Sequence, residues 1–233
     1  MNAEVMKLRA LPLPRWTTLG VFGALVTAIV IAAFAGMGEE NVAIGIGADL
    51  ATSIGSMILG VWIVGLEYGQ GTMRRVLSAN PRRGRVLAAK LATALLAAAV
   101  LTIVVYAISA AAFPPIADAH DQSLSVGDVV RMCAAALIGN LAYAAMGVAF
   151  ALLTRSMAGG ITLALGFAFI VDSALSAIPR VGDYAPQSAY LEIWDAITQE
   201  PGDHNVLRAS LVLAGWVVGL LAIGAARFLK RDA

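Results

Sequence analysis

Long runs of uncharged, apolar residues constrain this chain more than any other feature of its sequence. A helix that crosses the hydrocarbon core of a bilayer, about 30 Å thick, needs roughly 20 such residues. The chain has 233 residues, of which 60% are hydrophobic and 13% are charged. Soluble domains are only about 45–50% apolar. The sequence therefore predicts an integral membrane protein.

Six segments are long and apolar enough to cross the membrane as helices. They are rich in Ala, Leu and Val and lack the two-residue alternation of β-barrel strands. We expect an all-α polytopic membrane protein with one transmembrane domain over residues 1–233. The first run is full length, which favours a retained helix over a cleaved signal peptide. The predicted transmembrane helices are 16–36, 43–66, 86–115, 129–154, 156–178 and 207–228.

Lys and Arg are distributed unequally between the two sides that these helices define. Thirteen of the sixteen basic residues fall on the side of the two termini and the central loop, and the other side carries Arg131, Arg180 and Arg208. Basic loops resist translocation and stay in the cytoplasm. We therefore expect a bacterial-type plasma membrane protein with both termini in the cytoplasm.

Two amphipathic segments flank the predicted bundle. Residues 1–15 have the pattern of a helix lying in the cytoplasmic interface, although a flexible basic tail would have a similar composition. The outer loop Pro179–Asn205 spaces Tyr190, Trp194 and Ile197 at helical intervals. This spacing predicts a short helix that either dips into the outer leaflet or caps the bundle without meeting lipid.

Motifs for catalysis or cofactor binding are absent from the sequence. It has no GxxxxGK[ST] phosphate loop, no GxSxG elbow and no HExxH motif, and its single cysteine is Cys133. Asp118, His120 and Asp121 are interpreted as an exposed polar loop rather than a metal site. The net charge of +1 gives no reason to expect a nucleic-acid partner. We expect a chain that is not itself an enzyme and binds no cofactor or metal.

Polar residues within apolar runs are candidate functional residues, because hydrocarbon makes them costly. Asn140 lies near the centre of the fourth run, and Asp172 lies in the outer half of the fifth. Each either lines a translocation path or bonds a neighbouring helix. An intramembrane enzyme would need a catalytic pair, and the sequence shows no second member for Asp172. Glycine spacings such as Gly215 with Gly219 weakly support a packed bundle or dimer.

The central loop, residues 67–85, concentrates positive charge between two apolar runs. Gly71 is suited to a turn and Thr72 to capping a helix. The sequence predicts a short helix from about Met73 to Ala79, stopping before Asn80 and Pro81. Such a helix suits force transmission to a peripheral partner, whereas a plain basic loop would anchor topology through anionic lipid. The basic residues between Glu67 and the start of the next apolar run are Arg74, Arg75, Arg82, Arg83, Arg85 and Lys90.

The pattern EYxxGTxRxxLxxxPRRxRxLxAK, which runs from Glu67 to Lys90, resembles the cytoplasmic loop of type-2 ATP-binding-cassette permeases. The resemblance implies six helices, cytoplasmic termini, an N-terminal interfacial helix and a membrane-dipping element before the sixth helix. It also implies that the loop carries a coupling helix, which docks in a groove of a separate ATPase. The contact or support residues implied by position are Glu67, Gly71, Thr72, Arg74 and Arg75.

The expected function is that of a half-transporter. The resemblance implies two permease subunits, identical or homologous, each with its own ATPase subunit that binds ATP and magnesium. Small members of the family mostly export, and the few charges on the helices favour an amphipathic or hydrophobic substrate such as a drug, peptide or lipid. The alternative is a six-helix scaffold or sensor whose basic loop binds lipid or a cytoplasmic regulator.

Overall fold

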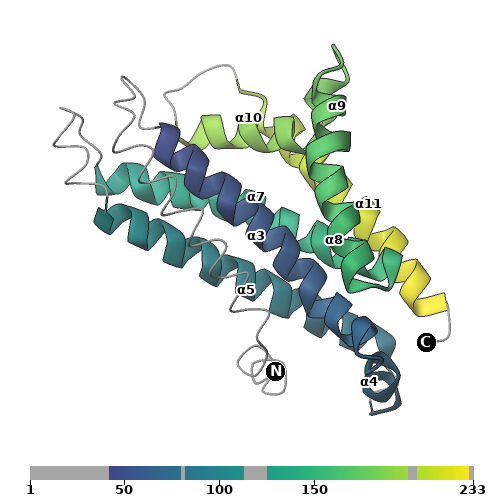
Figure 1. Cartoon of the computed structure of the whole chain (residues 1–233). Coiled ribbons are helices and arrows are strands. Elements are labelled where there is room, and N and C mark those ends of the chain that lie inside the picture. The colour runs from purple at the N-terminus through teal and green to yellow at the C-terminus, as the bar shows by residue number, and fades with distance from the viewer. Residues whose placement is uncertain (1–41, 80–81, 113–124, 199–203, 231–233) are drawn as a thin grey trace.

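The computed structural model describes residues 42–79, 82–112, 125–198 and 204–230 (Figure 1). In these ranges the fold is all helical, as predicted, and contains no strand. The predicted interfacial helix 1–15 and first transmembrane helix 16–36 lie outside the described residues, so a total of six helices stays a prediction. Five described helical segments are long and apolar enough to cross a membrane: Thr52–Gly69, Arg83–Ile108, Val126–Thr154, Met157–Ser176 and Val206–Lys230.

The helices follow one another in the order that the apolar runs predict. The four long ones are α3 (Val42–Gly69), α5 (Arg83–Ala112), α7 (Val126–Thr154) and α11 (Val206–Lys230). The short α4 (Met73–Ala79) lies between α3 and α5 and has the predicted bounds. The elements between α7 and α11 are α8 (Met157–Gly166), η1 (Phe167–Asp172), α9 (Ser173–Ser176), η2 (Gly182–Tyr184) and α10 (Pro186–Thr198).

The fifth apolar run contains a feature that its sequence does not announce. Within this run, η1 is a π-helix of six residues that joins α8 to α9 in one continuous helical segment. π-Helical turns are rare and occur frequently at functional sites. Asp172 is the last residue of this π-helix and is 1% exposed.

Helix α7 forms the centre of the bundle and packs against α3, α5, α8, α10 and α11. Small residues let its neighbours approach closely. A Cβ atom added to Gly60 of α3 would lie 2.1 Å from the carbonyl oxygen of Ala144, and one added to Gly147 of α7 would lie 2.1 Å from that of Met57. The α3–α7 crossing therefore depends on glycine at both positions.

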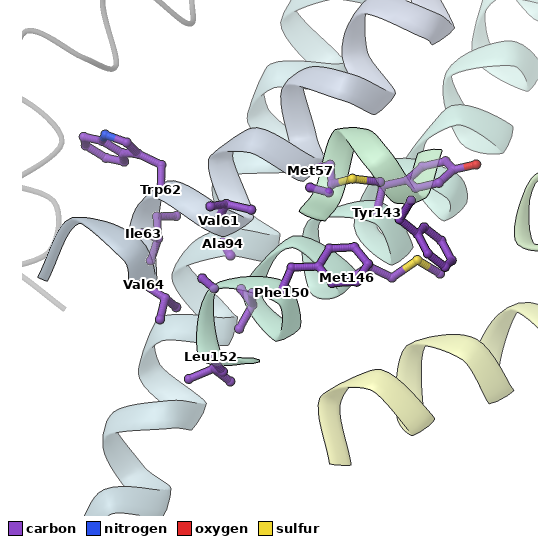
Figure 2. Packing of buried hydrophobic residues seen from close by; sticks show 14 of the residues in the cluster. Met57, Val61, Trp62, Ile63, Val64, Ala94, Tyr143, Met146, Phe150 and Leu152 are labelled. Atoms are coloured by element: carbon purple, nitrogen blue, oxygen red, sulfur yellow. The ribbon is translucent and has the colours of Figure 1, made fainter. Parts of the chain in front are cut away.

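Side chains of α3 and α7 supply much of the main hydrophobic core. Figure 2 shows Met57 and Val61 of α3 beside Tyr143, Met146 and Phe150 of α7. All five are buried. The packing of these two helices holds the α3–α4 loop in place at one end of the bundle.

The two ends of the bundle differ in what they carry. Helix α4 and the C-terminal end of α11 lie at one end, whereas α10 lies near the start of α3 at the other (Figure 1). Among the described residues, no atom lies within 4 Å of a Cβ added to Gly215 or Gly219 of α11, so their spacing does not serve packing among the described helices.

Candidate functional site

The loop between α3 and α4 is a tight turn with a glycine at the position that has a left-handed backbone. Gly71 has φ +64°, a conformation that glycine adopts without steric cost. The backbone N–H of Thr72 donates to the carbonyl of Glu67 at 2.9 Å. The Thr72 hydroxyl also donates to this carbonyl, at 3.4 Å. The predicted turn at Gly71 is present, and Thr72 closes it.

A buried ion pair joins the two ends of this loop region. Lys90 Nζ of α5 lies 2.8 Å from Glu67 Oε1 of α3, and the two side chains are only 2% and 3% exposed. Lys90 also donates to the carbonyl of Ile63 at 3.4 Å. The cost of removing two charges from water is offset only by good pairing and added hydrogen bonds. The Glu67 side chain is therefore enclosed within the bundle rather than exposed at its surface.

Helix α4 is anchored on one side and open on the other. Met73 is 3% exposed and belongs to the main hydrophobic core. Arg75 and Ser78, two and five positions further on, are exposed. Arg74 follows Met73 on this helix, and its side chain lies outside what the structure describes. A peripheral protein could reach the guanidinium of Arg75 directly.

Three arginines at this end of the bundle bind the carbonyl groups of helix ends. Arg83 Nη1 donates to the carbonyls of Phe228 and Leu229, at 3.4 and 3.5 Å. Arg155 Nη2 donates to the carbonyl of Arg227 at 3.2 Å, and Arg227 Nη1 donates to that of Leu153 at 3.2 Å. Helix C-termini leave carbonyls without intrahelical partners and favour cations. These three arginines therefore tie α5, α7 and α11 together.

Asn140 bonds helices to one another rather than lining an open space. Its Nδ2 atom donates to Thr102 Oγ1 of α5 at 2.9 Å, and its Oδ1 atom accepts from Ser53 Oγ of α3 at 3.0 Å. The side chain is 0% exposed. Of the two interpretations of Asn140, the described contacts favour helix packing.

A cavity of about 290 Å³ lies at the opposite end, between α3, α7, the α8–η1–α9 segment and α10. Two carboxylates, those of Asp49 and Asp172, line it together. The sequence shows no second member for Asp172, and the structure places Asp49 in the lining of the same cavity. The two residues are far apart in the chain, and the folding of the bundle brings both to one cavity.

Both carboxylates accept hydrogen bonds from neutral donors. Asp49 Oδ1 accepts from the Tyr190 hydroxyl at 2.6 Å, and Asp172 Oδ1 accepts from the backbone N–H of Gln187 at 3.3 Å. Burial and then the nearby Asp49 carboxylate raise the pKa of the Tyr190 phenol, so it donates as a neutral hydroxyl. Within the described ranges, neither carboxylate has a Lys or Arg ion-pair partner.

The aromatic residues of α10 face the bundle. Tyr190 is 2% exposed, and Trp194 and Ile197 pack against the main hydrophobic core. The Tyr190 ring meets those of Tyr143 and Trp194 edge to face, with centroids 6.0 and 6.1 Å apart. A Cβ added to Gly139 would lie within 2.3 Å of the Tyr190 ring. These contacts favour the capping-helix alternative for this face of α10.

Helix α11 is also bonded to η2 and α10, the elements that precede it. Arg208 Nη2 lies 2.9 Å from Glu192 Oε2 of α10, and Arg208 Nη1 lies 3.3 Å from Asp183 Oδ2. Trp216 Nε1 donates to the carbonyl of Tyr184 at 2.8 Å. With the arginine contacts at its other end, α11 is bonded to both ends of the bundle.

The described residues contain no group of three or more His, Cys, Asp and Glu side chains that could hold a metal ion. Asp118, His120 and Asp121 lie outside the described residues. The candidate site therefore has two parts: the exposed helix α4 at one end of the bundle and the cavity with two carboxylates at the other. Hydrogen bonds and ion pairs between the helices connect them.

The fold defines the chain as a multi-pass helical membrane protein. The sequence model of a family described as "ABC-2 family transporter protein" matches residues 22–233. The chain therefore belongs to the ABC-2 family and is the membrane permease of an ATP-binding-cassette transporter. Permeases of this family normally work with an ATPase subunit and are generally not catalytic. No curated protein matches the chain.

Proposed function

We propose that this chain is the permease subunit of an exporter for amphipathic or hydrophobic compounds, powered by a separate ATPase subunit that binds α4. The observation that carries this proposal is the buried ion pair of Glu67 and Lys90, 2.8 Å apart. The pair braces the base of a short exposed helix in a family whose permeases normally work with an ATPase. Lipid anchoring would need positive charge alone and would not need a braced turn.

Each residue of the α3–α4 loop has a separate role in this proposal. Arg75 is exposed on α4 and contacts the ATPase, together with Arg74. Gly71 and Thr72 set the direction in which α4 leaves α3, through the left-handed backbone and the bonds to the Glu67 carbonyl. Glu67 supports this turn from within the bundle. The contact surface is thus small, and the bundle holds it in a defined orientation.

The arginine contacts provide a route from the loop to the rest of the bundle. Arg83 begins α5 directly after the α4 loop and holds the last carbonyls of α11. Helix α11 in turn is bonded to α10 through Arg208 and to the η2 segment through Trp216. A displacement of α4 therefore acts on α11, whose far end is bonded to α10 at the cavity.

The ATPase shifts the permease between states only if it binds one state more tightly. In the proposed cycle, ATP and magnesium close two ATPase subunits, which press on the α4 helices of two permease subunits, identical or homologous. The permease subunits then rock and open a central path outward. The basic end that carries α4 faces the cytoplasm of a bacterial-type cell, with both chain termini on that side.

The test reverses charge on α4 and measures ATPase capture. The double variant Arg74→Glu, Arg75→Glu is purified in mild detergent with the ATPase co-expressed. Arg180→Glu, an exposed arginine at the other end of the bundle, supplies the same kind of charge change as a control. We expect the double variant to lose most of the bound ATPase, because two repulsive charges would enter the contact. The control retains it.

Retention of the ATPase by the double variant, together with full transport, would exclude α4 as the docking element. Loss of the ATPase from the Arg180→Glu control as well would show that capture responds to net charge alone.

A further inference from the structure

The cavity between α3, α7, the α8–η1–α9 segment and α10 has a composition that the transport proposal does not explain. It is lined by apolar side chains such as Ile54, Met57 and Leu165, by aromatic rings, and by the carboxylates of Asp49 and Asp172. No Lys or Arg of the described residues lines it. Two carboxylates without a cation are costly in such surroundings. The cavity therefore combines a mainly apolar wall with two carboxylates.

We propose that this cavity binds an organic cation with an apolar tail, with the cationic group held by Asp49 and Asp172 and the tail against the aromatic wall. The inference rests on the proposed transport function for its biological role, and it narrows the substrate class to cationic amphiphiles. The binding itself requires neither the ATPase nor ATP.

The aromatic wall is the second feature that selects this ligand class. Tyr143, Tyr190 and Trp194 form a consecutive edge-to-face series with centroids 6.0 and 6.1 Å apart, and all three line the cavity together with Phe169. Aromatic faces attract quaternary ammonium groups and other cations. Rings and carboxylates around one space favour a cation over a neutral or anionic compound of equal size.

The carboxylates are held in place before a ligand arrives. Tyr190 donates to Asp49 at 2.6 Å, and the Gln187 N–H donates to Asp172 at 3.3 Å. Tyr190 is itself fixed against Gly139. Preorganised groups lose little freedom on binding. Each of these bonds occupies the Oδ1 atom of its carboxylate.

The closing experiment uses the full chain in lipid nanodiscs without ATP. The probe is phenylbutyltrimethylammonium, and its neutral counterpart carries a tert-butyl group in place of trimethylammonium. We expect the native chain to bind the cation about tenfold or more tightly than the neutral compound. Asp172→Asn keeps the acceptor oxygen for Gln187, removes the charge and is expected to reduce this preference about tenfold or more. Asp49→Asn should act in the same direction.

Asp183→Asn is the matched control, because Asp183 is an exposed carboxylate at the same end that does not line the cavity. It should leave both affinities unchanged. If Asp172→Asn still binds the neutral compound, its cavity remains folded. If Asp172→Asn binds neither probe, the comparison is made with Asp49→Asn instead. Equal affinity of the native chain for the two probes, or an undiminished preference in both cavity variants, would overturn the inference. Neither result bears on ATPase docking, which is tested separately.

Discussion

Glu67 of α3 and Lys90 of α5 form an ion pair 2.8 Å long, with both side chains almost fully buried. The pair links the residues that precede and follow the α4 loop. Both residues stand in the motif that runs from Glu67 to Lys90, at its two ends. Their contact explains why a carboxylate and an ammonium group belong to a loop whose other charges are arginines.

Removing one member of this pair should destabilise the bundle. Lys90→Met removes the ammonium group that lies 2.8 Å from the Glu67 carboxylate, and breaking a buried pair costs about 3–5 kcal/mol. We expect a marked fall in the thermal midpoint of the detergent-solubilised protein. The double variant Glu67→Gln, Lys90→Met removes both charges and should recover most of the loss. A single variant as stable as the native chain would show that the pair is not a brace.

The crossing of α3 and α7 should not tolerate an added methyl group. Gly147→Ala places a Cβ atom 2.1 Å from the Met57 carbonyl oxygen in the native geometry, so the helices must separate. Overpacking of this kind costs about 1–3 kcal/mol. Gly215→Ala on the open face of α11 is the control and should not reduce the thermal midpoint. Equal midpoints for the two variants would contradict the close crossing.

Asn140 should contribute to stability and not to ligand binding. Asn140→Leu leaves Ser53 and Thr102 without their bonds to this side chain, at a cost of about 1–3 kcal/mol. The thermal midpoint should fall while the affinity for phenylbutyltrimethylammonium stays within about twofold of native. A variant of native stability with altered binding would place Asn140 on the translocation path instead.

The contact between α10 and α11 should make stability depend on pH. The hydrogen bond from Arg208 lowers the pKa of Glu192 below its ordinary value of 4.5. Its contribution is therefore present above about pH 4.5 and is lost as the pH falls through the folded-state pKa. The difference in thermal midpoint between native chain and Glu192→Gln should be constant near neutral pH and shrink in acid. A difference independent of pH would contradict the bond.

Local features of the loop could be predicted from the sequence because short-range rules determine them. Gly71 provides the left-handed turn, and α4 begins at Met73 and ends at Ala79, before Asn80 and Pro81. The lengths of the apolar runs likewise predicted helices able to cross a membrane.

The pairings across the bundle could not be predicted, because they depend on how the helices pack. Nothing local links Lys90 to Glu67, or Asp49 to Asp172. The π-helix that ends at Asp172 also has no sequence signal that we recognise. Glu67 was expected as a contact or support residue, and its burial favours support.

The most direct test of ATPase docking is a cross-link from α4. The chain has one cysteine, Cys133, so Cys133→Ala gives a background in which single cysteines can be placed. Arg75→Cys carries a short photoreactive group on α4, and Arg180→Cys carries it at the opposite end. After illumination in native membranes, we predict a covalent product between the permease and the ATPase from Arg75→Cys and none from Arg180→Cys. A product from Arg180→Cys alone would contradict docking at α4.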